Sequence, residues 1–265
     1  GPLRRLREHM PPTAQATPEA LEITEAARQE GQYAGLVGEL FMGRLLTDLV
    51  FPYPEQPDAD RRIGDEYVAR VETFLREHVD PDAIDREGDI PPPVIEGLAK
   101  LGCFGMKIPK EYGGLGLSQT NYNRVIALVA SYCGSTAVWL SAHQSIGAPQ
   151  PLLLFGTDRQ KKQYLPRLAA GTISAFALTE PGVGSDPAKM LTTAVPIEDG
   201  SHYLLNGEKL WCTNGPVAEV IVVMAKTPPV IVKGRERQQI TAFLVEKSMP
   251  GFASRVTAPT SFVFD

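Results

Sequence analysis

The chain has 265 residues, of which 43% are hydrophobic and 22% are charged, and its formal net charge is −5. This size and apolar content are typical of a globular protein with one large domain or two modest ones, and the acidic balance argues against a broad nucleic-acid surface. Cys103, Cys133 and Cys212 lie far apart in the sequence. This spacing excludes a zinc ribbon or a disulfide framework, and we predict no metal site.

The first part of the chain is predicted to be helical after a short unstructured start. Residues 1–17 lack the apolar core of a signal peptide and resemble an expression remnant followed by a disordered Pro/Thr/Ala-rich segment. From residue 18 to 172, apolar residues recur mainly at helical spacing. The predicted helices are an arm within 19–50, then 61–79, 94–101, 118–133, 136–146 and 158–171, with a polar connection over 80–93.

One long stretch of this helical region carries no charge. No charged residue occurs between Val125 and Thr157, which is long enough to raise the question of a membrane span. Polar residues such as His143 and Gln144 interrupt it, so we predict helices nearly surrounded by protein and no transmembrane segment. Small residues in the stretch either leave room for a long ligand or permit tight helix packing. They are Gly134, Ser135, Ala137, Ala142, Gly147 and Ala148.

The sequence pattern changes at Ile173. Short alternating runs punctuated by Gly and Asn-Gly replace the helical spacing, which is typical of antiparallel strands. Helices followed by strands indicate an α+β fold, with an N-terminal helical domain over 18–172 and an antiparallel β-domain over 173–265. The predicted strands are 173–180, 191–197, 202–211, 217–226 and 239–246.

The segment Phe176–Asp186 (FALTEPGVGSD) is predicted to be a strand that breaks into a glycine turn. Gly182 and Gly184 let the backbone come close to a ligand and direct successive N–H groups at an anion or a ring edge. Thr179 and Ser185 add hydroxyl groups on either side. The same residues also fit an ordinary Gly/Pro loop that leaves a sheet, so this segment alone leaves both interpretations open.

Two segments taken together resemble the acyl-CoA dehydrogenases. They are Phe176–Asp186 and Leu205–Asn214 (LNGEKLWCTN), and Glu111–Gly116 and Leu154–Pro166 are also similar to elements of that family. Two further stretches resemble the very-long-chain branch and its complex-I-assembly relative. These stretches are Thr47–Pro54 (TDLVFPYP) and Ala142–Gly147 (AHQSIG).

The resemblance implies a helical N-terminal domain, a middle β-domain and a C-terminal four-helix domain that is absent here, with flavin adenine dinucleotide (FAD) between the last two. It implies FAD-dependent α,β-desaturation of long-chain fatty acyl-CoA thioesters in fatty-acid β-oxidation, with an electron-transfer flavoprotein as acceptor. The family's catalytic base is a glutamate of the C-terminal domain. No catalytic residue is therefore assigned. We expect the base beyond Asp265, and we expect the 265-residue chain alone to be inactive.

The resemblance also implies a set of FAD-binding residues. Some contact the flavin ring through backbone and hydroxyl groups, some lie beside the pyrophosphate, and an indole and a hydroxyl complete the ring site. Ser185 also lies near the CoA moiety and is a predicted substrate-binding residue. Without the resemblance, Trp211 equally fits a core aromatic on a strand. The ring contacts through backbone and hydroxyl groups are assigned to Phe176, Leu178 and Thr179, and the pyrophosphate contacts to Gly184 and Ser185. The indole belongs to Trp211, and the hydroxyl that completes the ring site belongs to Thr213.

The family resemblance further implies a homodimer or tetramer when the protein is full length. It would be cytoplasmic in a bacterium, or located in the mitochondrial matrix or at the inner membrane in a eukaryote. Two other functions remain open at this point. One is a non-catalytic assembly or scaffold protein on the same fold, and the other is a related flavin oxidase or monooxygenase.

Overall fold

The computed structural model describes residues 35–41, 43–53, 55–197, 200–232 and 234–255. The chain divides into two compact units, residues 1–55 and residues 56–265. In the first unit, the described residues form helix α3 (Leu36–Phe41) and a 3-10 turn (Thr47–Leu49). The predictions for residues 1–17 and for the first half of the 19–50 arm lie outside the described residues.

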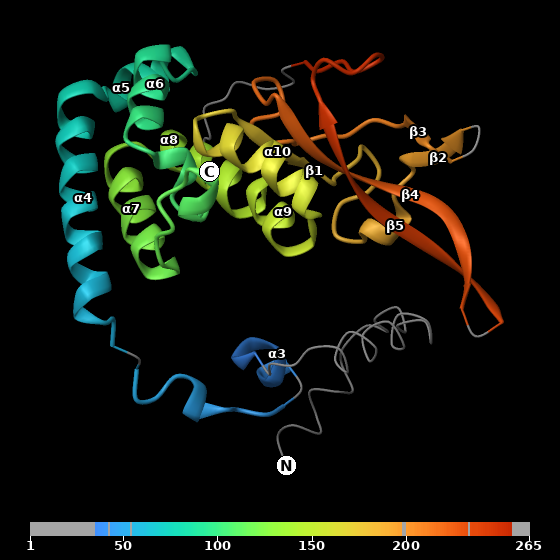
Figure 1. Cartoon of the computed structure of the whole chain (residues 1–265), viewed down its shortest axis with the longest axis horizontal. Coiled ribbons are helices and arrows are strands. Elements are labelled where there is room, and N and C mark those ends of the chain that lie inside the picture. Colours follow the sequence, from blue (N-terminus) through green and yellow to red (C-terminus); the bar gives the residue numbers. More distant parts are fainter. Residues whose placement is uncertain (1–34, 42, 54, 198–199, 233, 256–265) are drawn as a thin grey trace, which may run out of the picture. The chain divides into compact units, whose positions relative to one another are not determined.

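Seven helices open the described part of the second unit, and the longest of them is α4 (Figure 1). The apolar faces of the first five, α4 to α8, meet in one core in which Leu75, Leu98, Phe104, Val125 and Leu140 are all fully buried. Burying side chains of this size contributes roughly 1.5–3 kcal/mol each. The helices are α4 (Asp58–His78), α5 (Pro81–Glu87), α6 (Pro92–Lys100), α7 (Gln119–Tyr132), α8 (Gly134–Ser141), α9 (Pro149–Phe155) and α10 (Asp158–Ala169).

Local capping explains where several of these helices begin. The Ser118 hydroxyl accepts a hydrogen bond from the Asn121 N–H at the start of α7, and Thr157 and Gln160 form a reciprocal capping box on α10. The prediction of a polar connection over 80–93 was wrong in part, because α5 lies within it. Asp80 caps that helix and Gly88 ends it in the left-handed conformation, and both signals are visible in the sequence.

The predicted helix 136–146 consists of two elements. Helix α8 ends at Ser141 and continues directly into a wider π-helical turn, η4 (Ala142–Ile146). The turn places His143 and Gln144 in the interior, where both are fully buried. Gln144 donates to the carbonyl oxygen of Cys103 at 2.9 Å. Single π-helical turns within helices are often found at functional sites.

The strands form one five-stranded sheet after the helices, so the predicted order of elements is confirmed. The sheet is mixed rather than purely antiparallel. β1 and β2 pair parallel with β4, while β2–β3 and β4–β5 are antiparallel. A parallel pair requires a long crossover connection, which the chain between β1 and β4 supplies. The strands are β1 (Ser174–Ala177), β2 (Thr193–Ile197), β3 (His202–Asn206), β4 (Val220–Val232) and β5 (Arg235–Glu246).

Strand β4 organises the sheet. β5 follows one of its edges from Val220 to Val232, while β1 and then β2 occupy the other edge, at Val220–Val223 and at Lys226. The chain therefore leaves the sheet after β1 and returns to the same edge at β2. The loop between them, residues 178–192, contains the predicted glycine turn.

Helices α9 and α10 pack beside the sheet (Figure 1). Leu152, Leu165 and Leu168 form one apolar cluster with Val220 and Val222 of β4. This cluster joins α9 and α10 to strand β4. We call helices α7 to α9, with the π-helical turn η4 between α8 and α9, the helical wall.

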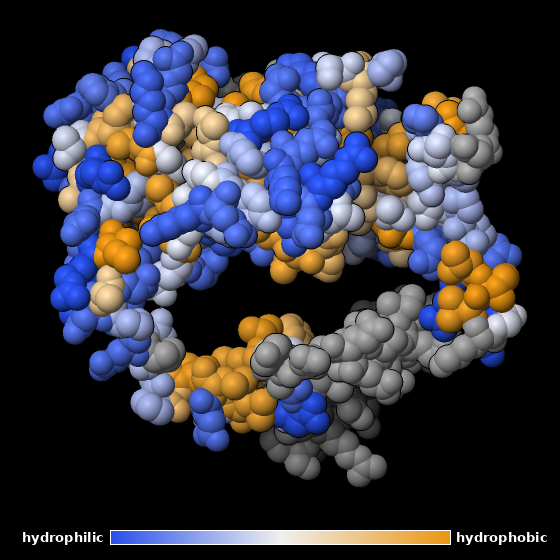
Figure 2. Space-filling view, viewed as in Figure 1, coloured by the Kyte–Doolittle hydropathy of each residue, from blue (hydrophilic) through white to orange (hydrophobic). Residues whose placement is uncertain are grey.

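Apolar side chains are also exposed on the sheet. Figure 2 shows an apolar patch at the far end of the β4–β5 hairpin, where Val230, Ile231 and Val232 reach the surface. In addition, Leu154 and Phe155 are exposed at the end of α9. Among the described residues, no helix is both long enough and apolar enough to cross a membrane.

Candidate functional site

The two segments that the sequence singled out lie against each other. The Leu210 N–H donates to the Thr179 carbonyl oxygen at 2.8 Å, and the Lys209 ammonium donates to the Leu178 carbonyl oxygen at 3.0 Å. The end of β1 and the segment that follows β3 are therefore joined by hydrogen bonds from backbone and side chain. We call residues 207–214 the Trp211 loop.

A third contact between these segments involves Cys212 and Phe176. Burial raises the pKa of the Cys212 thiol to about 11, so the thiol stays protonated and donates to the Phe176 carbonyl oxygen at 3.4 Å. The Phe176 ring itself packs into the apolar cluster of α9, α10 and β4. The carbonyl groups of Phe176, Leu178 and Thr179 are thus used to hold the Trp211 loop.

The glycine turn is tight and presents free N–H groups. Glu180 and Val183 exchange two backbone hydrogen bonds of 3.0 Å, which close the turn. Within the described part of the chain, the N–H groups of Gly182, Gly184 and Ser185 have no hydrogen-bond partner. A Cβ built on Gly182 or Gly184 would meet no atom within 4 Å. The turn therefore has open space beside donors that suit an anion.

Trp211 occupies a strained and exposed position. Its φ is +56°, a left-handed backbone conformation that is rare for a bulky residue, and its relative exposure is 69%. It lies on a loop, so the alternative of a core aromatic on a strand was wrong. Strain of this kind persists only where surrounding structure imposes it, and it clusters at functional sites. The exposed indole offers a flat apolar face to a ligand.

The hydroxyl groups of Thr179 and Thr213 complete this group of residues. Both residues are half-buried, and neither hydroxyl has a hydrogen-bond partner among the described residues. Thr213 also lines a hollow of about 210 Å³, together with Ser141, Ala142 and Ser145. The Trp211 loop and the helical wall therefore line the same cavity. Val138 and Ile146 complete its lining.

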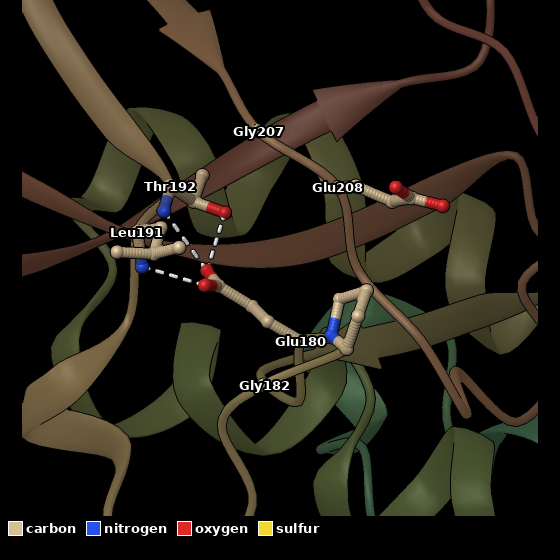
Figure 3. A pocket seen from close by; sticks show the side chains of 7 residues that line it. Glu180, Gly182, Leu191, Thr192, Gly207 and Glu208 are labelled. Carbon is tan, nitrogen blue, oxygen red and sulfur yellow. Dashed lines mark hydrogen bonds between the residues drawn. The ribbon is translucent and has the colours of Figure 1, made fainter.

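A second pocket, of about 220 Å³, is bordered by the glycine turn (Figure 3). It is lined by the turn, by the start of β2 and by the Trp211 loop. Glu180 lies at its base, and Figure 3 shows the Glu180 carboxylate directed at Leu191 and Thr192. The lining residues are Glu180, Pro181, Gly182, Leu191, Thr192, Gly207 and Glu208.

The Glu180 carboxylate is ionised, and both of its oxygens accept hydrogen bonds. Burial by itself would raise its pKa, but hydrogen bonds from Thr192, Leu191 and Lys209 outweigh burial and lower the pKa to about 2. Such a group cannot accept a proton at neutral pH. Sequence reasoning did not assign a role to Glu180 and missed Lys209 and Thr192 altogether. A carboxylate at a strand end and a lysine in the second motif were the only available signals.

A separate buried network lies where the helices meet β1. The His143 Nε2–H donates to the Phe104 carbonyl oxygen at 3.1 Å, and Nδ1 accepts from the Ser174 N–H at 3.1 Å and from the Ser174 hydroxyl at 2.9 Å. Burial lowers the pKa of His143 to about 4. A protonated Nδ1 would also face the Ser174 N–H donor, so the imidazole is neutral and joins the π-helical turn to the sheet.

Family models match most of the chain. The model of the acyl-CoA dehydrogenase N-terminal domain matches residues 65–172, and that of the acyl-CoA dehydrogenase middle domain matches residues 175–261. The chain belongs to the acyl-CoA dehydrogenase family. The matched ranges contain both the helical wall and the two segments that meet at the Trp211 loop.

Individual relatives of the family agree with this assignment. The chain is 48% identical over 234 residues to the probable acyl-CoA dehydrogenase FadE10 of Mycobacterium tuberculosis, covering 88% of this chain and 35% of the relative. It is 43% identical over 215 residues to the human mitochondrial very long-chain specific acyl-CoA dehydrogenase, covering 80% and 33% respectively. The chain thus spans about a third of the length of these relatives.

A solved structure of the family has the same fold. The Bacillus anthracis acyl-CoA dehydrogenase, complexed with FAD, matches with a TM-score of 0.64 and 34% identity, covering 80% of this chain and 35% of that chain. The described residues therefore have the fold of acyl-CoA dehydrogenases, as the sequence predicted. No cluster of three side chains suited to a metal ion occurs in the described ranges.

Proposed function

We propose that this chain forms the N-terminal and middle parts of an FAD-dependent dehydrogenase that desaturates long-chain fatty acyl-CoA thioesters between the α and β carbons. One observation carries the proposal. The glycine turn after β1 and the strained Trp211 loop are hydrogen-bonded together, and their free donors and exposed indole face open space.

The residues present fit the cofactor that the family uses. The N–H groups of Gly184 and Ser185 would hold the pyrophosphate, the hydroxyls of Thr179 and Thr213 would donate to the ring heteroatoms, and the Trp211 indole would cover the ring. FAD, when bound, supplies the acceptor for the two electrons removed from the substrate. Phe176 and Leu178 would serve through their backbone, which fixes the Trp211 loop.

The helical wall fits an acyl chain. Ser141, Ala142 and Ser145 line the hollow beside Thr213, and their small side chains leave the space open. The alternative of tight packing holds at Gly147, where a Cβ would lie 2.5 Å from the His143 carbonyl oxygen, and the side chains of Ala137 and Ala148 are also buried. It does not hold at Gly134, where a Cβ would meet nothing within 4 Å.

No residue in the described ranges is assigned as the base that removes the α-proton. Glu180 is unsuitable because its lowered pKa makes its carboxylate a very weak base and because four donors occupy its oxygens. We propose, as the family resemblance implies, that a carboxylate beyond Asp265 serves this purpose. We further propose an electron-transfer flavoprotein as acceptor, a homodimer or tetramer for the complete protein, and a cytoplasmic or mitochondrial location according to the source.

A substrate test distinguishes this function from a non-catalytic scaffold role. A protein that contains this chain together with the family's C-terminal helices is loaded with FAD and mixed with palmitoyl-CoA. We expect rapid loss of flavin absorbance, and we expect Thr213→Val to slow it at least tenfold because a donor to the ring is lost. A flavin-loaded protein that no acyl-CoA of any length reduces would contradict the proposal and favour a scaffold role.

A further inference from the structure

We propose that Glu180 and Lys209 act together as a positioning clasp, which holds the Trp211 loop against the end of β1 and thereby fixes the indole and the two threonine hydroxyls relative to one another. The purpose of the clasp rests on the proposed function. Its mechanics rest on contacts within this chain alone.

Glu180 closes the loop between β1 and β2. One carboxylate oxygen accepts from the Leu191 N–H, and the other accepts from both the N–H and the hydroxyl of Thr192 (Figure 3). The loop leaves the sheet after Ala177 and returns at Thr193. The carboxylate therefore ties the beginning of this loop to its end.

Lys209 attaches the Trp211 loop to the same carboxylate. Its ammonium lies 2.9 Å from Glu180 Oε1 and 3.0 Å from the Leu178 carbonyl oxygen. The two side chains are only 10% and 3% exposed. The next residue, Leu210, donates its N–H to Thr179, and Trp211 follows directly. Each of these three hydrogen bonds connects the Trp211 loop to the residues that follow β1.

Close packing between the two loops supports the clasp. A Cβ on Gly207 would lie 2.3 Å from the hydroxyl oxygen of Thr192, and that hydroxyl donates to Glu180. The Trp211 loop therefore begins in direct contact with a partner of the carboxylate. At its other end, Asn214 donates to the Trp139 carbonyl oxygen of α8 at 3.0 Å. The loop is held on both sides of the strained residue.

The chemistry of the pair indicates positioning more than general stability. Burying two charges costs desolvation that their attraction barely repays, and apolar side chains often stabilise a core as well. A charged pair with fixed hydrogen-bond directions instead selects one arrangement of its partners. The left-handed backbone of Trp211 needs such a restraint, because strain relaxes where the surrounding structure permits.

The first test needs no flavin. Amide hydrogen exchange is measured in wild type, Glu180→Gln, Lys209→Met and the matched control Glu246→Gln, which breaks the Arg167–Glu246 ion pair of the same 2.9 Å length. We expect exchange at the Leu210 N–H to rise at least tenfold in both clasp variants. The control and Lys209→Arg should leave Leu210 close to wild type.

The results that would overturn the clasp are equally specific. Unchanged exchange at Leu210 in the single variants contradicts it. An equal rise at Leu210 and at Val222 of β4 in the double variant E180Q/K209Q, which leaves no buried charge unpaired, also contradicts it. If the single variants do not fold, the double variant E180Q/K209Q keeps neutral hydrogen-bonding groups at both positions and takes their place in the comparison.

The second test addresses the ligand. FAD affinity is followed through Trp211 fluorescence in a Trp139→Phe background, since the chain has two tryptophans. We expect Glu180→Gln to weaken binding at least tenfold and Lys209→Arg to restore most of the affinity lost in Lys209→Met. Equal affinity in wild type and Glu180→Gln overturns the positioning role. If the wild-type chain binds no FAD by itself, the comparison is made in a protein that also carries the family's C-terminal helices. Failure to bind FAD there contradicts the proposed function, and the exchange experiment then decides on the clasp alone.

Discussion

Strand β1 has a buried polar network at each end, and the two networks differ in charge. At its start, the neutral His143 ring contacts backbone groups of Phe104 and Ser174. Beyond its end, the ionised Glu180 contacts Lys209 and the loop that leads into β2. The first joins a helical turn to a strand in the core, and the second joins two loops beside a pocket. The neutral network therefore holds the fold, whereas the charged one holds the site.

The largest effect is expected from Lys209→Met. It leaves the Glu180 carboxylate buried beside Thr192 without its cation, and breaking one side of a buried pair costs about 3–5 kcal/mol. Urea denaturation of the two proteins measures the difference. The double variant with Glu180→Gln should recover much of the loss, and a double variant that is less stable than Lys209→Met would contradict the account of the charged network.

Gly147→Ala tests the neutral network by overpacking. The new Cβ would lie 2.5 Å from both the His143 carbonyl oxygen and the Ser174 hydroxyl oxygen, so we expect a loss of about 1–3 kcal/mol. Gly134→Ala is the matched control, because its Cβ meets nothing within 4 Å and alanine favours a helix by about 0.5–1 kcal/mol. Equal effects of the two substitutions on the denaturation midpoint would show that the junction is not tightly packed.

The two networks should respond to acid in different pH windows. The folded pKa of His143 is about 4 and its unfolded value is 6.5, so the unfolded state binds the extra proton and stability falls as pH drops from 6.5 towards 4. About 1.5 kcal/mol should be lost between pH 6.5 and 5, and His143→Gln should remove this slope. The pKa of Glu180 is about 2 in the folded state and 4.5 in the unfolded state. Its contribution to stability is therefore fully present above pH 4.5 and is lost as the pH falls through 2.

Denaturation curves between pH 7 and pH 3 check these windows. Glu180→Gln should leave the slope between pH 6.5 and 5 intact and reduce the slope below 4.5. A Glu180→Gln variant that flattens the upper window instead would mean that the two networks are not separate.

The smallest effect is expected from Glu246→Gln. The Arg167–Glu246 pair is as short as the clasp, at 2.9 Å, but its side chains are partly exposed. Solvent screens such pairs, so the loss should be below about 1 kcal/mol. A loss as large as that of Lys209→Met in the same urea series would show that burial does not distinguish the two ion pairs.

Much of the fold could be predicted from local signals. Ser118 and the spacing of Val125 and Val129 gave α7 close to its observed position, and the alternating runs after Ile173 gave the five strands. Two strand ends were wrong, because the predicted strand 202–211 ends at Asn206 and the predicted strand 217–226 continues to Val232. The parallel pairing of β1 with β4 could not be predicted, because strand direction within a sheet depends on contacts between distant residues. Helix α5 could have been predicted, since Asp80 and Gly88 are ordinary caps.

The candidate site was predictable only in part. The two motifs indicated Thr179, Gly184, Trp211 and Thr213 through family resemblance, and the structure brings the two segments together. The roles of Glu180 and Lys209 could not be read from the sequence. They depend on a hydrogen-bond geometry that forms only when residues 29 positions apart meet in three dimensions.

The most direct test of the central claim is an FAD titration of a purified protein that contains this chain together with the family's C-terminal helices, followed by amide and indole NMR signals. The account predicts shifts concentrated at Thr179, Gly182, Gly184 and Thr213 and at the indole N–H of Trp211, with the Trp139 indole unaffected. Shifts elsewhere on the molecule, or none up to the solubility limit of FAD, would contradict it.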